Sequence, residues 1–241
     1  MNTLFIRGLR YQPPDNANVY PYSIPSIKNI EKIEFTQPVT FFVGENGSGK
    51  STIIESIAIA AGFSAEGGTK NYNFSSQDSS SSLHKDLTLV RGTVREKFGY
   101  FLRAESFYTT ANYADNGTDL GGGPSPLFFN GKRIHEQSHG EAFLAIANDL
   151  PARGLYVFDE PESALSPKRL FALMLRMNKL IEQGSQFIIA THSPILLAYP
   201  GIIYELSDKG IAKVSYDDLE HVQLTRDFML HPEAFMRHIL E

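Results

Sequence analysis

Apolar residues along this chain fall into three short continuous runs and two longer periodic stretches. The runs at 38–43, 155–158 and 186–190 are almost wholly apolar and rich in β-branched and aromatic residues. Such runs are typical of strands buried on both faces. The stretches beginning at Lys50 and Pro167 instead repeat apolar positions every three or four residues, which predicts amphipathic helices. A strand, helix, strand order predicts a right-handed parallel crossover in an α/β fold.

The ends of both helices are marked by residues that favour such positions. The first helix is predicted over Lys50–Ala61, with Gly62 placed to stop it. The second has Ser166 as a candidate N-cap, Pro167 in its first turn and Gly184 at its end. Its predicted buried stripe is Leu170, Leu173, Met174, Met177, Leu180 and Ile181.

Three further stretches carry weaker signals. Residues 75–82 are serine-rich, and 109–126 contain Asn, Asp, three consecutive glycines and two prolines. Both stretches are predicted to be surface loops, and the second is alternatively a mobile segment beside a ligand. The last stretch, 217–241, is predicted to be helical and to pack on the core, with partner docking as the alternative. Its apolar positions are Leu219, Val222, Phe228, Met229, Phe235, Met236 and Ile239.

Composition narrows the class of protein. A chain of 241 residues with 42% hydrophobic residues can bury one sizeable core, so we expect a single domain over 1–241. The chain has no cysteine, no secretion-signal pattern and no apolar run near the ~20 residues of a membrane span, which favours a cytoplasmic protein without direct membrane insertion.

The net charge of −5 argues against a protein whose main task is to neutralise nucleic-acid phosphates. A loose basic stretch is nevertheless present, and we expect a solvated surface there rather than a nucleic-acid track. It consists of Lys85, Arg91, Arg95, Lys97 and Arg103.

A glycine-rich loop follows the first strand and precedes the first helix, which is the context that a phosphate-binding loop requires. Its residues are Gly44, Glu45, Asn46, Gly47, Ser48, Gly49, Lys50, Ser51 and Thr52. Glycines let successive backbone N–H groups turn toward phosphates, and the helix N-terminus adds a favourable dipole. Lys50 is expected to reach the β- and γ-phosphates, and Ser51 to bind Mg²⁺.

Acidic and imidazole side chains follow the other two strands. Asp159 and Glu160 come directly after the second strand, and His192 follows the third. Because parallel strands end at the same sheet edge, these groups should lie near the glycine loop. Asp159 is suited to holding Mg²⁺ through water, and Glu160 to orienting or deprotonating a water that attacks the γ-phosphate. His192 is expected to contact the γ-phosphate or Glu160.

The segments GENGSGKST, VFDEPESAL and ATHS, in this order, resemble the ABC ATPase class, including its soluble Rad50- and SMC-like members. A closer resemblance, over nearly the whole chain, is to small bacterial AAA-family (AAA15-type) ATPases. It rests on the stretches FFVGENGSGKST, FLRAESF, IHEQSHGE and SQFIIATHSPILLAYPG. The resemblance implies a P-loop fold with a mixed sheet, flanking helices and a small lateral subdomain. Long coiled-coil arms are not expected, since no heptad run lies between Ser51 and Ser138.

The same resemblance implies that Ser138 and Gly140 form the ABC signature and cap ATP held by a second copy. The protein would then act as an ATP-sandwiched homodimer. His139 departs from the family pattern, which has a glycine at this position. The region 95–115 has no glutamine to act as the usual Mg²⁺ and water sensor, and Glu105 is the candidate to replace it. Tyr20 and Tyr22 are candidates for stacking on adenine, although core packing is the simpler expectation for both tyrosines.

Other functions also fit parts of the sequence. His135–His139 satisfies the HExxH pattern of zinc hydrolases, but a helix that begins at Ser138 would leave His135 outside it. An ATP-gated switch in a larger defence or DNA-maintenance assembly is a second alternative, with an unidentified protein or nucleic acid as partner. A transporter subunit is disfavoured, because the span 105–135 is short for a coupling subdomain. ATP hydrolysis with Mg²⁺ is the favoured interpretation.

Overall fold

A computed structural model describes residues 4–15, 18–30, 32–70, 81–103, 128–129, 132–133 and 139–240. The described residues form a seven-stranded sheet in the order β12-β11-β3-β10-β9-β6-β4. The five inner strands are parallel, and β12 and β4 pair antiparallel at the two edges. The strands are β3 (Val39–Gly44), β4 (Gly68–Thr69), β6 (Phe98–Arg103), β9 (Gly154–Asp159), β10 (Gln186–Ala190), β11 (Ile202–Ser207) and β12 (Gly210–Val214). The predicted α/β fold with a mixed sheet is confirmed.

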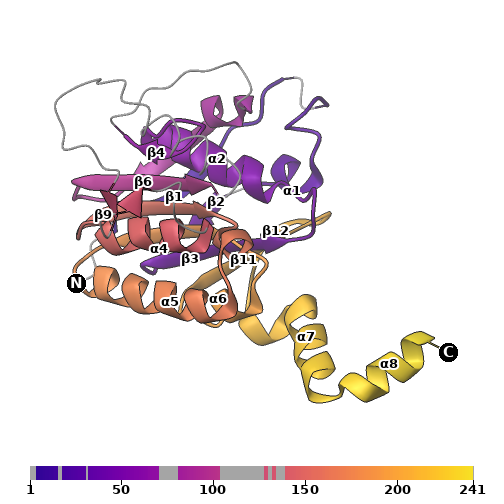
Figure 1. The fold of residues 1–241 in the computed structure, drawn as a ribbon. Coiled ribbons are helices and arrows are strands. Elements are labelled where there is room, and N and C mark those ends of the chain that lie inside the picture. Colours follow the sequence, from indigo (N-terminus) through magenta and orange to yellow (C-terminus); the bar gives the residue numbers. More distant parts are fainter. Residues whose placement is uncertain are drawn as a thin grey trace.

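Side chains on the two faces of this sheet enter two separate hydrophobic cores. In β9, Tyr156 and Phe158 point into one core, whereas Leu155 and Val157 point into the other. The first core is closed by α4 (His139–Asp149), α5 (Pro167–Glu182) and α6 (Pro194–Leu197). Figure 1 shows these helices on one side of the sheet and α1 (Pro25–Lys28) and α2 (Lys50–Ala61) on the other. Burial on both faces explains why the central strands are apolar throughout.

A second sheet covers α2 on the far side of the second core. It is antiparallel, with the order β2-β1-β5, formed by β1 (Ile6–Tyr11), β2 (Lys32–Glu34) and β5 (Leu87–Arg91), and the 3₁₀ helix η1 (Ser82–Lys85) leads into β5. The buried Gln186 side chain joins the two sheets. Its Oε1 accepts hydrogen bonds of 2.9 and 3.0 Å from the N–H groups of Phe5 and Ile6, and its Nε2 donates to the Ile6 carbonyl.

The predicted helices agree closely with the structure. The bounds of α2 are Lys50–Ala61 as expected, and Gly62 ends it with φ 97°. Ile53, Ile54 and Ile57 of α2 are fully buried, and each contributes about 1.5–3 kcal/mol through burial. Helix α5 follows Ser166, but the Ser166 side chain makes no capping hydrogen bond. The α5 stripe is buried at Leu170, Leu173, Met177 and Leu180, and half-buried at Met174 and Ile181.

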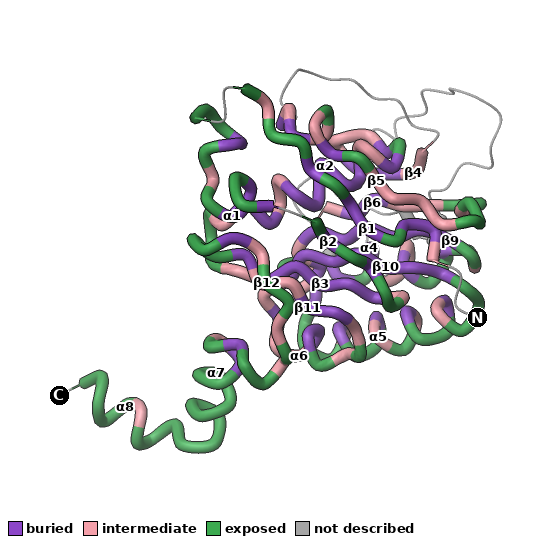
Figure 2. The backbone as a smooth tube through the Cα atoms, turned by 180° about the vertical axis from the view of Figure 1, so that it is seen from behind, coloured by how far each residue is buried: buried purple, intermediate pink, exposed green. Residues whose placement is uncertain are grey.

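The carboxyl-terminal helices differ from expectation. After the 3₁₀ helix η4 (Tyr216–Asp218), α7 (Glu220–Leu230) and α8 (Pro232–Leu240) extend away from the body, as Figures 1 and 2 show. The expected packing on the core holds for Leu219 and Val222 and is wrong beyond them, because α8 has no buried residue. The exposed residues include Phe228, Met229, Met236 and Ile239, while the Phe228 and Phe235 rings pack edge to face. An amphipathic pattern specifies an apolar face but not what covers it.

Two short strands, β7 (Phe128–Phe129) and β8 (Lys132–Arg133), pair antiparallel within the span 105–135. Most of the loops 75–82 and 109–126 lies outside the described residues. No helix among the described residues is both long enough and apolar enough to cross a bilayer.

Candidate functional site

Three segments that sequence analysis singled out meet at the carboxyl edge of the large sheet. Strands β3, β10 and β9 are adjacent, and in the register Ala190 lies beside both Phe42 and Asp159. Because all three strands run in the same direction, the glycine loop, Asp159–Glu160 and His192 emerge at the same edge. Ligands of open α/β sheets bind at such edges.

The glycine loop turns sharply between β3 and α2. Gly47 and Gly49 have φ of 82° and 95°, in the left-handed region that favours glycine. The loop is also held from outside, since the Ser26 hydroxyl donates a hydrogen bond to the Ser48 carbonyl. Gly49 leads directly into α2, so the free N–H groups of the first helical turn lie beside the loop. Such an arrangement is typical of anion-binding sites.

The Lys50 ammonium folds back over this loop. Its Nζ donates hydrogen bonds of 2.9 Å to the carbonyls of Gly44 and Glu45. The residue is only 4% exposed, and burial lowers the pKa of the ammonium, while the nearby carboxylates Glu160 and Asp159 oppose that shift. The positive charge of Lys50 therefore lies within the loop and beside the acidic pair.

Ser51 and Asp159 are brought together from the helix and the strand. The Ser51 hydroxyl donates a hydrogen bond of 3.3 Å to Asp159 Oδ1, and Asp159 is buried. Hydroxyl and carboxylate oxygens are the hard ligands that Mg²⁺ prefers. The two residues that the sequence assigns to the metal thus fit a magnesium ion bound at the loop.

Arg103, at the end of β6, is a site residue that sequence reasoning missed. Its Nη1 lies 2.7 Å from Glu55 Oε2, and its Nε lies 3.8 Å from Asp159 Oδ2. Arg103 belongs to the loose basic stretch that is predicted to form a solvated surface. The expectation of a solvated surface is therefore wrong for Arg103, and Arg91 is likewise ion-paired, with Glu96. Only the pairing of β6 with β9, which sets Arg103 opposite Asp159, reveals this position.

Glu160 has a strained backbone. Its φ of 49° and ψ of 55° lie in the left-handed region, which is uncommon for a residue with a side chain. Its N–H donates a 2.9 Å hydrogen bond to the Ala190 carbonyl, which fixes the turn into the 3₁₀ helix η3 (Pro161–Ala164). The Glu160 carboxylate lies 3.5 Å from His192 Nε2, so the expected proximity of these residues is observed.

Glu162 is the second residue that sequence reasoning left without a role. Its Oε1 accepts a hydrogen bond of 2.5 Å from the His192 backbone N–H, which ties η3 to the end of β10. Burial raises the pKa of Glu162, and hydrogen bonds from the His192 backbone and Thr191 oppose the shift. Burial also lowers the pKa of the His192 imidazole, with the Lys50 charge acting in the same direction. A neutral imidazole beside the Glu160 carboxylate follows near neutral pH.

The two tyrosines that are candidates for stacking on adenine lie in different environments. Tyr22 is buried, and its hydroxyl donates to Asp86 at 2.5 Å, so it packs in the core. Tyr20 is 65% exposed, and its hydroxyl lies 3.3 Å from Thr52 Oγ1 beside the glycine loop. Of these two tyrosines, Tyr20 is the one with an exposed ring near that loop.

Of the two residues assigned to the ABC signature, Ser138 and Gly140, the structure describes Gly140. Gly140 lies in the first turn of α4, where an added Cβ would approach the Ala164 carbonyl to 2.8 Å. Ser138, Glu105 and the HExxH residues His135 and Glu136 lie outside the described residues, as does the His139 side chain. Within the described ranges, no group of three or more His, Asp or Glu residues could hold a metal ion.

Two family models match separate segments of the chain. Residues 22–113 match a family described as "AAA domain", and residues 141–198 match one described as "AAA domain, putative AbiEii toxin, Type IV TA system". The first segment carries the glycine loop, and the second carries Asp159, Glu160 and His192. A comparison with curated proteins found no match.

Several solved structures are similar to this chain over most or all of its length. They include cbiO1 from Clostridium perfringens, part of the ABC transporter complex cbiONQ, at 15% identity and a TM-score of 0.51, covering 100% of this chain and 99% of that one. The ADP conformation of MJ1267, an ATP-binding cassette of an ABC transporter, matches at 17% identity and 0.51, covering 99% and 100%. The SMC head domain from Thermotoga maritima matches at 15% identity and 0.47, covering 88% and 99%. The chain has the fold of the P-loop ATPases of the ABC class.

Proposed function

We propose that this protein binds ATP with Mg²⁺ and hydrolyses it at a site completed by a second copy of the chain. The observation that carries the proposal is the 3.3 Å hydrogen bond between Ser51 and Asp159, with Lys50 and Glu160 beside it. An anion-binding loop, a buried carboxylate and a second, half-buried carboxylate in one place suit phosphoryl transfer to water. The single domain expected over 1–241 is part of the same proposal.

Each residue then has a distinct task. Backbone N–H groups of 44–52 and the Lys50 ammonium bind the β- and γ-phosphates. Ser51 and Asp159 hold Mg²⁺, which supplies charge neutralisation on the phosphates when bound. Arg103 orients Asp159, because its guanidinium lies between Asp159 and Glu55.

Glu160 is the proposed general base. It accepts a proton from water as the water oxygen bonds to the γ-phosphorus, and the bond from that phosphorus to the bridging oxygen breaks to release ADP. Glu160 is suited to this task because it directly follows β9 at the edge that carries the glycine loop and its carboxylate is half-exposed. His192, at 3.5 Å, is placed to orient Glu160 or to donate to the γ-phosphate, while Glu162 positions the His192 backbone.

The second copy supplies Ser138 and Gly140. In this proposal a twofold dimer places the N-terminus of α4 of each chain over the phosphates held by the other. The exposed glycine loop is accessible to such a partner, since Glu45, Asn46 and Gly47 are exposed.

Two measurements test this proposal. ATP turnover per chain is followed with Mg²⁺ over a wide range of protein concentration, and we expect the specific rate to rise and then saturate. Next, Lys50→Ala protein is mixed with Ser138→Arg protein. Each is expected to be inactive alone, and an equal mixture should recover about one quarter of the wild-type rate, because half of the dimers contain one intact composite site.

Other outcomes of these tests contradict parts of the proposal. If the mixture forms dimers normally but stays inactive, Lys50 and Ser138 act on the same ATP within one chain. If wild-type protein binds ATP but shows no turnover at any concentration, the chain is an ATP-gated switch rather than an ATPase. Turnover that requires zinc and survives Lys50→Ala would favour the HExxH alternative.

A further inference from the structure

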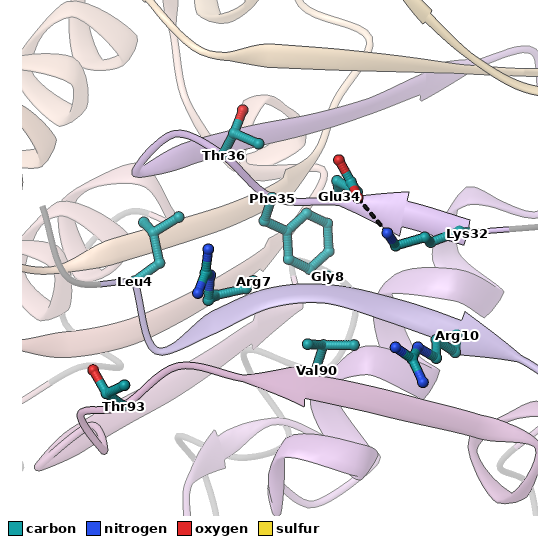
Figure 3. A pocket seen from close by; sticks show the side chains of 10 residues that line it. All are labelled: Leu4, Arg7, Gly8, Arg10, Lys32, Glu34, Phe35, Thr36, Val90 and Thr93. Atoms are coloured by element: carbon teal, nitrogen blue, oxygen red, sulfur yellow. Dashed lines mark hydrogen bonds and ion pairs between the residues drawn. The ribbon is translucent and has the colours of Figure 1, made fainter.

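The outer face of the β2-β1-β5 sheet holds a cavity that is separate from the glycine loop. Figure 3 shows this cavity, whose volume is about 470 Å³. None of its lining residues belongs to the loop or to the edge that carries Asp159 and His192. Polar residues form most of its wall: Arg7, Arg10, Lys32, Glu34, Thr36 and Thr93.

A bulge in β1 gathers basic side chains on this face. The register of β1 against β5 shifts between Ile6 and Gly8, so Ile6 and Leu9 enter the core while Arg7 and Arg10 are both exposed. The two arginines are three residues apart, about 10 Å along an extended strand. The bulged strand therefore exposes two cations, Arg7 and Arg10, to solvent.

The neighbouring strand adds a third cation directly opposite. Arg10 pairs with Lys32 across β1 and β2, so two like charges face each other on one side of the sheet. Such a pair is destabilising unless an anion lies near it. Lys32 forms an ion pair with Glu34, whose pKa is lowered by that contact and by the charge of Arg7. Within the described ranges, neither Arg7 nor Arg10 has an ion-pair partner, so the face carries an excess of two positive charges.

The exposure of the side chains that line the cavity favours an extended polyanion over a small ligand. Small-molecule sites bury most of their ligand, whereas the Lys32 and Glu34 side chains in this wall are 55% and 56% exposed. The aromatic ring in the lining, Phe35, is 1% exposed and cannot stack on a base. Binding would therefore use charge and the threonine hydroxyls, which is how proteins contact a phosphodiester backbone.

We propose that the β1–β2 face, through Arg7, Arg10 and Lys32, binds the phosphodiester backbone of a nucleic acid without reading its sequence. This site would act independently of ATP hydrolysis. It is compatible with the net charge of −5, because the attraction is local to a face whose two arginines each match one phosphate.

The test is fluorescence anisotropy of labelled 20-mer oligonucleotides, single- and double-stranded, titrated with the full chain without nucleotide at several salt concentrations. The double variant Arg7→Gln/Arg10→Gln is compared with Lys168→Gln/Lys179→Gln, which removes the same charge from exposed positions of α5. We expect the arginine variant to bind roughly tenfold more weakly and to lower the slope of log K against log salt by about 1.4 for single strands and 1.8 for duplex. The lysine control should behave like wild type.

Two competitors and one further variant make the result decisive. Inorganic phosphate or AMP that displaces the oligonucleotide at equal concentration would overturn the proposal, because the site would then be for small anions. No binding at low salt, or equal loss in both double variants, would also overturn it. Lys50→Ala protein should bind the oligonucleotide normally, and the arginine variant should hydrolyse ATP like wild type, so failure of this proposal is distinguishable from failure of the proposed ATPase function.

Discussion

The Ser51 hydroxyl and the Asp159 carboxylate, 108 residues apart in the chain, are joined by a hydrogen bond of 3.3 Å. This contact brings the first turn of α2 against the end of β9, and Lys50 and Glu160 flank it on either side. The chemistry of the site therefore depends on the packing of one helix against one strand. Substitutions at these positions should separate nucleotide binding from hydrolysis.

Replacing Lys50 with alanine should abolish ATP binding, because the loop would lose the charge that its two carbonyl contacts hold in place. Equilibrium binding of a fluorescent ATP analogue measures the loss. Lys168→Ala, at an exposed position in the first turn of α5, is the matched control and should bind normally. Unchanged binding by a folded Lys50→Ala protein would remove the loop from the proposed site.

Glu160→Gln should keep ATP binding while lowering turnover by about 10²–10⁴-fold, because the amide cannot accept the proton from water. Single-turnover and steady-state ATPase assays measure the change, and the ATP-bound dimer should persist during size-exclusion chromatography. Glu233→Gln, in the exposed helix α8, serves as the control. Normal hydrolysis by Glu160→Gln would exclude this residue as the base.

The stability of the protein should fall as the medium is acidified, partly because of His192. Burial and the Lys50 charge lower its folded-state pKa below the ordinary 6.5, while Glu160 opposes the shift and His221 adds to it. The unfolded chain therefore takes up the proton more readily, so stability is lost as pH falls from about 6.5 through the folded-state pKa. Urea midpoints at pH 7.5 and 5.5 should differ less for His192→Gln than for wild type. An unchanged difference would mean that His192 does not contribute to this pH dependence.

Arg103→Ala should lower the free energy of unfolding by about 1–3 kcal/mol, because Glu55 and Asp159 would lose the cation that lies between them. Urea denaturation measures the change. The exposed pair of Arg226 with Asp217 provides the comparison, and Arg226→Ala should cost less than about 1 kcal/mol. Equal effects at both positions would show that the Arg103 contacts are no stronger than a surface ion pair.

Tyr20→Ala should weaken ATP binding about fivefold or more, since stacking of a base on an aromatic ring contributes about 1–3 kcal/mol. Binding of inorganic triphosphate should not change, because it has no base to stack. Tyr20→Phe keeps the ring and should bind ATP like wild type, even though it loses the hydroxyl contact with Thr52. A loss of triphosphate affinity would instead indicate an effect on the glycine loop.

The parts of the site that sequence alone could predict are those specified by local signals. The bounds of α2 follow from its apolar spacing and from Gly62, and the apolar run at 186–190 gives β10 without error. The glycine loop and the acidic pair follow such strands directly, so their place at one sheet edge could be predicted. Local spacing and strand direction carry all the information needed for these elements.

Residues whose roles depend on long-range pairing could not be predicted in this way. Arg103 reaches Asp159 because β6 pairs with β9 in one particular register, and Glu162 reaches the His192 backbone only when η3 folds against β10. The apolar positions of α7 and α8 present the opposite case. Their spacing predicts helices correctly but cannot show that Phe228 and Met229 remain exposed.

Because α8 is exposed, its backbone amides should exchange hydrogen much faster than those of the central sheet. Its nine residues have no buried position, and an isolated helix shorter than about 12–15 residues is marginal in water. Its backbone amides should therefore exchange through local opening, within seconds to minutes. The amides of β10 lie between two paired strands and two hydrophobic cores, so their exchange should require global unfolding and should report the full stability of the domain.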